Sequence, residues 1–220
     1  MKKFKARSLA LSLIMLATPV MAEVSVTGTL TSDYVFRGIS QTDSSPAIQL
    51  GVDYAHNNGF FVGAWGSNVD FGDDANTELD LFVGYSGNAQ NFSYDANFVY
   101  YTYQGYESED EANYGEIIVN AYIDAITITI GYASDYAQLG ESVTYFGAAY
   151  DIELPHDVSL TLQSGYSIGE EALGQDYIDY SATIAKTFNG FDLSAAIINT
   201  DISDDDSAEA RLVLTASRAF

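Results

Sequence analysis

After residue 22, apolar and polar side chains alternate with a period of two along almost the whole chain. In residues 126–132, for example, three isoleucines and a tyrosine alternate with two threonines and a glycine. Successive side chains of a β-strand point to opposite faces, so this pattern is typical of strands with one apolar and one polar face. The 3.6-residue period of an amphipathic helix does not occur in this region. The chain is therefore predicted to be all-β.

The alternating runs are also longer than the strands of most soluble proteins. Each is close to the ~9–11 residues that a tilted strand needs to cross a bilayer, whereas soluble strands commonly have about 5–6. The number of alternating runs is even, as is the number of strands in bacterial outer-membrane barrels. These features predict a transmembrane antiparallel up-and-down β-barrel of about 12 strands. The predicted strands cover residues 24–35, 45–55, 60–70, 77–86, 92–103, 113–123, 126–136, 143–152, 158–167, 177–187, 191–201 and 208–220.

The connections between the runs alternate in length. Every second connection is a tight turn, as at residues 56–59, 124–125 and 189–190, and two of these three contain Asn-Gly. The others are mostly longer and acidic, with only the third, near Asp73 and Asp74, being brief. Outer-membrane barrels have short periplasmic turns and longer external loops. Both termini are therefore expected on the periplasmic side.

Residues 1–22 have the features of a secretory signal peptide. Four basic residues precede an apolar segment at residues 9–20, and Val20-Met21-Ala22 offers a small-residue cleavage site. An uncleaved membrane anchor is the alternative, but the apolar segment is shorter than the ~20 residues of a spanning helix. We therefore predict a signal peptide at residues 1–22 and a barrel at residues 23–220, located in the outer membrane of a Gram-negative cell.

The charge balance excludes several classes of protein. The chain has 31 acidic and 8 basic residues and no cysteine, which argues against nucleic-acid partners and excludes disulfides and cysteine-based zinc sites. Loss of residues 1–22 removes four basic and no acidic residues, which changes the net charge from −23 to −27. Disorder is not expected, because 47% of the residues are hydrophobic, with 17 tyrosines and 12 phenylalanines. A soluble β-sandwich would not explain the long strands, alternating loops and signal peptide together.

Placing the apolar side chains of each strand toward lipid turns many carboxylates toward the lumen. Crowded carboxylates repel one another unless water or cations screen them, so a wet interior that attracts cations is favoured. The predicted function is a porin that passes small cations or neutral solutes. The candidate pore-lining residues are Asp33, Arg37, Asp53, Asp70, Asp80, Asp95, Glu116, Asp179 and Arg211. The same alternation, in which every second residue of a strand points inward, also turns Glu78, Asp151, Asp192 and Glu209 toward the lumen. We call this position of a residue in the alternation its parity.

The alternative is a structural or surface-interaction barrel that does not conduct. In that case Arg37 and Arg211 would pair with some of the carboxylates and plug the lumen. Arg37 could instead orient an anionic group of a solute, but a role in tying the first loop to the acidic wall is favoured. Several tyrosines lie near strand ends and are expected at the lipid boundary. They are Tyr34, Tyr54, Tyr85, Tyr103, Tyr136 and Tyr180.

An outer-membrane hydrolase is the least favoured function. A serine-type site needs a histidine near the outer rim, whereas His56 and His156 both fall in predicted periplasmic turns. No catalytic residues, metal motif or cofactor site are predicted. The acidic stretch at residues 204–206 is expected to be a solvated loop that bridges through divalent ions to lipopolysaccharide rather than a dedicated metal site.

Three segments carry a family resemblance. Residues 26–42 (VTGTLTSDYVFRGISQT), 45–49 (SPAIQ) and 60–70 (FFVGAWGSNVD) resemble the opening of the TorF family of proteobacterial proteins. The resemblance implies an outer-membrane β-barrel with a porin role, without an established substrate or catalytic residues. The terminal Phe220 resembles the aromatic residue recognised by the barrel assembly machinery, although Arg218 departs from that pattern. The expected partners are thus outer-membrane lipid, lipopolysaccharide, this machinery and small solutes.

Overall fold

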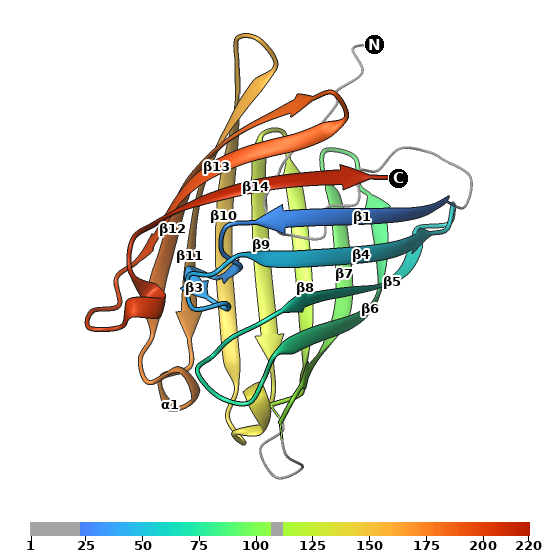
Figure 1. Ribbon diagram of the computed structural model, residues 1–220. Coiled ribbons are helices and arrows are strands. Elements are labelled where there is room, and N and C mark those ends of the chain that lie inside the picture. The colour runs from blue at the N-terminus through green and yellow to red at the C-terminus, as the bar shows by residue number, and fades with distance from the viewer. Residues whose placement is uncertain (1–22, 107–111) are drawn as a thin grey trace.

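A computed structural model describes residues 23–106 and 112–220, and in it twelve antiparallel strands form a closed barrel (Figure 1). Each strand pairs with its neighbours in the chain, and the first pairs with the last, so the predicted all-β barrel of twelve strands is confirmed. The predicted signal peptide lies outside the described residues. The strands are β1 (Glu23–Thr31), β4 (Ala47–Ala55), β5 (Phe60–Asn68), β6 (Thr77–Asn88), β7 (Ser93–Gln104), β8 (Tyr114–Ile123), β9 (Ile126–Ala133), β10 (Val143–Leu154), β11 (Val158–Ile168), β12 (Tyr177–Phe188), β13 (Phe191–Thr200) and β14 (Arg211–Ala219).

Short elements lie in the connections. A two-stranded hairpin of β2 (Val35–Phe36) and β3 (Ile39–Ser40) follows β1. The 3-10 helices η1 (Tyr136–Gln138) and η2 (Asp206–Ala208) and the helix α1 (Glu170–Leu173) lie in later loops. In the part of the chain that the structure describes, no helix is long and apolar enough to cross a membrane.

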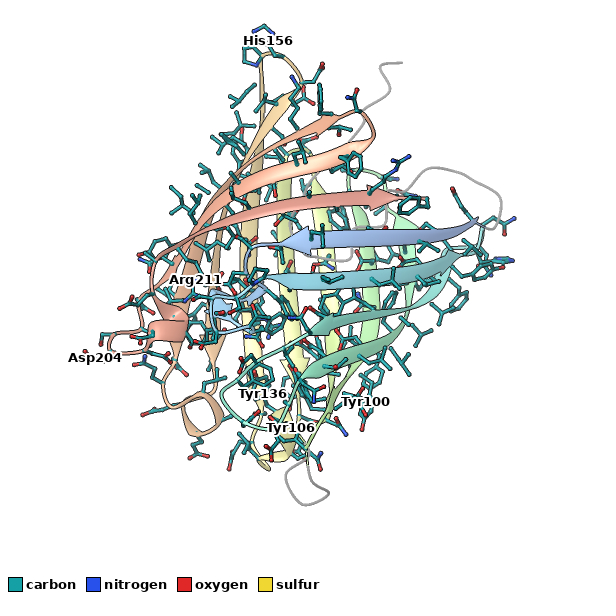
Figure 2. All side chains as sticks on the ribbon, viewed as in Figure 1. Tyr100, Tyr106, Tyr136, His156, Asp204 and Arg211 are labelled. Atoms are coloured by element: carbon teal, nitrogen blue, oxygen red, sulfur yellow. The ribbon has the colours of Figure 1, made fainter. Side chains whose placement is uncertain are left out.

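The short and long connections alternate as predicted. The short ones, which form the turn end of the barrel, are residues 56–59, 89–92, 124–125, 155–157 and 189–190. The long ones, which form the loop end, are residues 32–46, 69–76, 134–142, 169–176 and 201–210, and the connection between β7 and β8 is described only at residues 105–106 and 112–113. The third connection was predicted to be brief, but it extends over residues 69–76 because β5 ends at Asn68. Figure 2 shows His156 at the opposite end of the barrel from Asp204 and Tyr106.

Burial follows the alternation of the sequence. In β6, Leu79, Leu81 and Val83 are between 42% and 52% exposed, whereas Glu78 and Asp80 are buried. The outward face is therefore apolar and uncovered, and the polar side chains of the same strand lie inside. This arrangement is the reverse of a soluble domain and is typical of a barrel that faces lipid.

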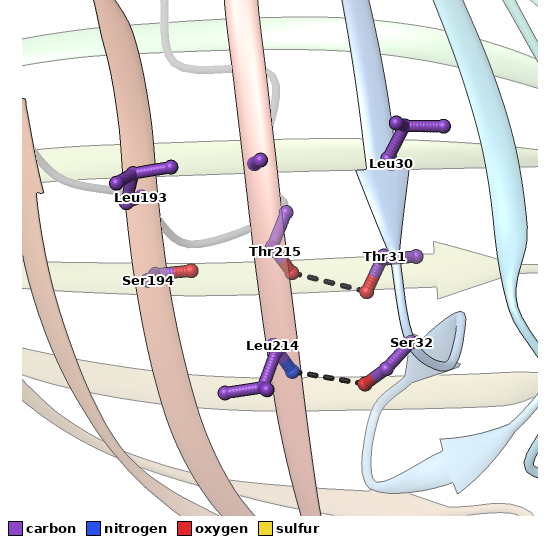
Figure 3. Close-up of a pocket in the computed structure, with 8 residues that line it drawn as sticks. Leu30, Thr31, Ser32, Leu193, Ser194, Leu214 and Thr215 are labelled. Atoms are coloured by element: carbon purple, nitrogen blue, oxygen red, sulfur yellow. Dashed lines mark hydrogen bonds between the residues drawn. The ribbon is translucent and has the colours of Figure 1, made fainter. Parts of the chain in front are cut away.

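The closing seam between β1 and β14 is reinforced by side chains. The ladder runs from Thr27↔Ala219 to Thr31↔Thr215. At the last pair of the ladder the Thr31 and Thr215 hydroxyls are 3.0 Å apart, and beyond it the backbone N–H of Leu214 donates to the Ser32 hydroxyl at 2.9 Å, beside a surface pocket (Figure 3). Among the described residues each of the twelve barrel strands pairs with a neighbour on both sides, so closure satisfies most of the backbone hydrogen bonds of the barrel.

The interior contains more aromatic side chains than the alternating pattern predicts. On the side of β5–β9 it contains a buried hydrophobic cluster of Phe61, Phe82, Val99, Tyr101, Tyr114 and Ala133. Three of the tyrosines expected at the lipid boundary also turn inward: Tyr34 is buried, and Tyr103 and Tyr136 pack against buried clusters. The prediction was wrong for these three because they lie on inward-facing or loop positions. Tyr54, Tyr85 and Tyr180 are exposed on the outer face.

Candidate functional site

The first loop, residues 32–46, folds into the barrel. The first strand was predicted to continue to residue 35, but β1 ends at Thr31 and the chain turns inward. Asp33, Tyr34, Ser40 and Thr42 are each no more than 5% exposed. A loop of this kind narrows the lumen at the loop end.

Asp33 organises the base of the first loop. Its Oδ1 atom accepts hydrogen bonds from the hydroxyls of Ser40 at 2.7 Å and Thr42 at 2.9 Å. Its Oδ2 atom accepts from Nη1 of Arg211 on β14 at 2.8 Å. The backbone N–H of Asp70 also donates to the carbonyl of Gln41, which ties the base to the loop after β5. The base of the loop is therefore held on both sides of β1.

Arg37 lies at the tip of the first loop and crosses to the far wall. Its Nη2 atom is 2.6 Å from Oε1 of Glu116 on β8, and the two side chains are 9% and 1% exposed. The hydroxyl of Tyr101 donates to the other carboxylate oxygen of Glu116 at 3.0 Å. The guanidinium carbon lies 4.2 Å from the ring centroid of Tyr145 and 4.7 Å from that of Phe36. The charge is thus paired and flanked by aromatic rings, which compensates for its removal from water.

The tip also contacts the opposite strands through a tight turn. Arg37 has a φ of 48° and Gly38 a φ of 85°, so the chain is left-handed at two successive residues. A Cβ atom at Gly38 would lie 2.9 Å from Cβ of Asp179 on β12 and closer still to Thr200 on β13. Glycine is therefore required at this position both for its φ and for space. The first loop spans the lumen from β1 to β8, β10, β12 and β13.

The structure places most of the predicted candidate residues inside the barrel. Asp33, Asp80, Asp95, Glu116 and Asp179 are buried, Asp53 is half-buried on β4, and Arg37 and Arg211 are paired as described above. Asp70 differs, because it lies exposed in the loop at residues 69–76 rather than on the wall. Glu209, turned inward by parity, is likewise exposed in the last loop, because β14 begins only at Arg211.

Hydrogen bonds satisfy the inner carboxylates to different degrees. Asp95 accepts from the Tyr122 hydroxyl at 2.6 Å and from the side-chain amide of Asn120 at 3.0 Å. In contrast, Glu78 Oε2, Asp80 Oδ1 and Asp179 Oδ2 are buried without a hydrogen-bond partner. Buried polar atoms in native proteins are normally bonded to protein or water. These three carboxylates therefore leave acceptor capacity available to water or to cations in the lumen.

The inner face on the other side of the barrel is lined with small side chains. On β12–β14 and β1 the inward positions are mostly serine, threonine and alanine, and several remain half-buried rather than buried. Examples are Thr183, Ser194, Thr215, Ser217 and Thr27. Hydroxyls on small side chains leave room for water. The lumen is therefore asymmetric, with aromatic packing along β5–β9 and a small, polar lining along β12–β1.

Sequence reasoning missed the aromatic residues around Arg37. Tyr101 has the same parity as Asp95 and Asn97 on β7, and Tyr145 has the same parity as Gly147 on β10. Each tyrosine occupies the same alternate position as inward residues of its strand, and this could have placed it in the lumen. From the sequence, however, neither was assigned to the lumen. Tyrosine is common at both the lipid boundary and the interior, so residue type alone did not distinguish them.

The histidines and acidic residues are the potential metal ligands in the part of the chain that the structure describes. Within residues 23–106 and 112–220, no three or more His, Asp or Glu side chains form a group that could hold a metal ion. His56 and His156 lie in short connections at the turn end. Asp204, Asp205 and Asp206 are exposed in the last loop. The acidic positions 107, 109, 110 and 111 of the third long loop lie outside the described residues.

Comparisons with known proteins agree with this architecture. Residues 17–218 match a family described as a bacterial protein of unknown function (Gcw_chp). The structure of a KdgM porin superposes with a TM-score of 0.58 at 12% identity, covering 89% of this chain and 99% of that chain. The NanC porin gives a TM-score of 0.57 at 10% identity, covering 90% and 98%. A second KdgM structure, in complex with disordered oligogalacturonate, gives 0.57 at 10% identity, covering 90% of this chain and 98% of that chain.

At these identities the likeness concerns the fold. A search of curated proteins found no match. The narrower resemblance to the TorF family stays a prediction.

Proposed function

We propose that this chain, which belongs to the Gcw_chp family of bacterial proteins of unknown function, is an outer-membrane channel for small cations or neutral solutes. The uncovered apolar face of the strands supports a position in a bilayer, where lipid would cover it. The loop end would face outward and the turn end the periplasm. The acidic loops would then meet lipopolysaccharide, with divalent ions bridging between like charges.

The main support for this proposal is the excess of acidic over basic residues inside the barrel. Six acidic residues are buried in the interior or the first loop: Asp33, Glu78, Asp80, Asp95, Glu116 and Asp179. Of the cations that the structure describes, Arg37 and Arg211 face them, and each is already paired with one carboxylate. The remaining negative charge would attract cations and repel anions, as acidic rings do in cation channels.

The same charge argues against an acidic solute. The KdgM porin has been captured with oligogalacturonate, a sugar chain that carries carboxylates. A comparable anion would meet unpaired carboxylates in this barrel, and like charges in a narrow space cost free energy. The solute proposed for this chain is therefore of the opposite charge or neutral.

One observation favours a second candidate, a sealed structural barrel. The first loop crosses the lumen and packs against several walls, so it could close the passage completely. In that case the protein would contact lipid and neighbouring molecules without transporting a solute. The half-buried small residues along β12–β1 favour the channel over this alternative.

Liposome swelling separates the two candidates. Purified barrel in liposomes is exposed to isosmotic neutral sugars and amino acids of graded size. The channel predicts swelling that declines with solute size, whereas a sealed barrel gives the rate of empty liposomes for all solutes. Swelling with none of them would contradict the channel proposal.

A further inference from the structure

The guanidinium of Arg37 occupies a site that is built mainly by the barrel wall. Glu116 provides the anion, Tyr145 provides a ring face at 4.2 Å, and Tyr101 holds the second carboxylate oxygen of Glu116. Gly131 on β9 forms the remaining side. We call these four residues, Glu116, Tyr145, Tyr101 and Gly131, the guanidinium cradle. An anion combined with an aromatic face is the usual environment of a bound planar cation.

The cradle does not depend on the first loop for its geometry. Gly131 pairs directly with Tyr145 across β9 and β10, and Glu116 lies on β8 beside β9. Tyr101 is stacked on Tyr114 of β8, with ring centroids 4.6 Å apart. Only Phe36, the second ring near the guanidinium, belongs to the loop. The site would therefore persist if the tip of the loop moved away.

The position of Gly131 shows that space for the cation is part of the wall. A Cβ atom there would lie 2.8 Å from Nη2 of Arg37 and 2.5 Å from Oε1 of Glu116. Any other residue at this position would push against both partners of the ion pair. The absence of a side chain at Gly131 thus leaves the space in which the guanidinium of Arg37 lies beside Glu116.

The tip of the first loop, unlike its base, could move away from the guanidinium cradle. Its base is fixed through Asp33, which accepts hydrogen bonds from Ser40, Thr42 and Arg211. The tip is held by the ion pair of Arg37, by the packing of Gly38 against Asp179 and Thr200, and by the edge-to-face contact of Phe36 with Tyr101. Arg37 also has a left-handed backbone, which is unfavourable for a residue with a side chain. Loss of the Arg37 contacts would therefore loosen the tip without releasing the base.

We propose that the guanidinium cradle is a binding site for solutes that carry a guanidinium group, and that Arg37 occupies it as an internal ligand when the first loop is folded in. The chain's own arginine then competes with the solute for one carboxylate. This inference rests on the proposed channel function in one respect only, that a solute can reach the lumen.

Conductance in planar bilayers tests the site through Arg37→Ala. Removal of the side chain empties the cradle, so Arg37→Ala should conduct more than the wild type. Added methylguanidinium should then block it, at concentrations about tenfold lower than for the wild type, because a charge-assisted hydrogen bond becomes available. Tetramethylammonium cannot donate hydrogen bonds, so its block should differ less between the two proteins than the block by methylguanidinium. Arg218→Ala, at an exposed position outside the lumen, is the matched control and should behave as the wild type.

Direct binding separates failure of the site from failure of the channel. Calorimetry on detergent-folded Arg37→Ala should detect methylguanidinium binding, and Arg37→Ala combined with Glu116→Gln should weaken it about tenfold or more. Binding without conductance would overturn the channel and keep the site. Conductance without methylguanidinium binding would overturn the site. Equal binding by Arg37→Ala and by Arg37→Ala combined with Glu116→Gln would overturn it as well. Arg37→Gln replaces Arg37→Ala if the latter yields no folded barrel by its electrophoretic mobility before and after heating.

Discussion

Arg37 and Glu116 are 79 residues apart in the chain and form an ion pair of 2.6 Å across the barrel. Both side chains are almost fully buried, so each depends on the other for compensation of its charge. Glu116→Ala would leave the arginine unpaired, and we expect it to lower the free energy of unfolding by about 3–5 kcal/mol. Urea unfolding of the refolded barrel, followed by its change in electrophoretic mobility, measures this loss.

A double-mutant cycle provides the control. Arg37→Ala combined with Glu116→Ala removes both charges, so the pair should cost less than the sum of the single variants. Glu209→Ala, at an exposed acid in the last loop, should change the unfolding free energy by about 0.5 kcal/mol or less. Strictly additive losses in the cycle would show that the two side chains do not interact.

Gly131 provides an independent probe of the same contact. A Cβ atom there would crowd Arg37 and Glu116, so Gly131→Ala should destabilise the barrel by about 1–3 kcal/mol and displace the tip of the first loop. Gly28→Ala on β1 is the matched control, because no atom lies within 4 Å of a Cβ atom at that position. Both variants should be compared by urea unfolding and by protease cleavage in the first loop. Equal sensitivity of the two variants would contradict the close packing of Arg37 on β9.

The alternating pattern predicted the barrel because each strand has one face in each environment. The outward Leu79, Leu81 and Val83 and the inward Glu78 and Asp80 were separable by parity alone. The path of the first loop was not predictable in this way, because residues 32–46 do not alternate as one strand. The sequence suggested that Arg37 could tie this loop to an acidic wall, but it did not identify Glu116 as the partner. That choice depends on how far the loop reaches across the lumen, which only the closed barrel determines.

The alternating pattern predicted the wrong side for residues where a strand ended earlier or began later than expected. Asp70 and Glu209 were turned inward by extending the pattern past Asn68 and before Arg211, and both lie in loops. Strand ends are set by turns and loop contacts, such as the hydrogen bond from Asp70 to Gln41, rather than by hydrophobicity. The inward tyrosines were missed for a different reason, since an aromatic ring suits both the lipid boundary and a packed interior.

Two acidic residues at the loop end, Glu141 and Glu171, predict a pH dependence of the loops that carry them. A hydrogen bond to Glu171, and its negative charge, raise the pKa of Glu141 above its usual value. The folded form therefore binds this proton more tightly, so the contact is present at acid pH and is lost as pH rises through the raised pKa. Amide exchange in residues 134–142 and 169–176, corrected for intrinsic rates, should slow in acid. Glu171→Gln should flatten this dependence, and an unchanged profile in that variant would exclude the pair as its cause.

The expected recognition of Phe220 by the barrel assembly machinery can be tested in cells. Phe220 is 76% exposed, and the Arg218 guanidinium lies 5.2 Å from its ring centroid. We expect Phe220→Ala to lower the amount of folded barrel in the outer membrane of cells, while the stability of barrel refolded in detergent changes little. Immunoblots of outer-membrane fractions, with and without heating, measure the folded amount. Arg218→Ala is the control, and an equal loss in both variants would point to their ring contact rather than to recognition of the terminal aromatic.

The reversal potential in a potassium chloride gradient tests the acidic lumen most directly. With purified protein in a planar bilayer, we expect single-channel steps and a reversal potential of the sign given by potassium selectivity. Asp179→Asn should reduce that selectivity, because it removes a buried carboxylate with which neither Arg37 nor Arg211 forms an ion pair. A reversal potential of the sign given by chloride selectivity, or the absence of channel steps, would contradict the account.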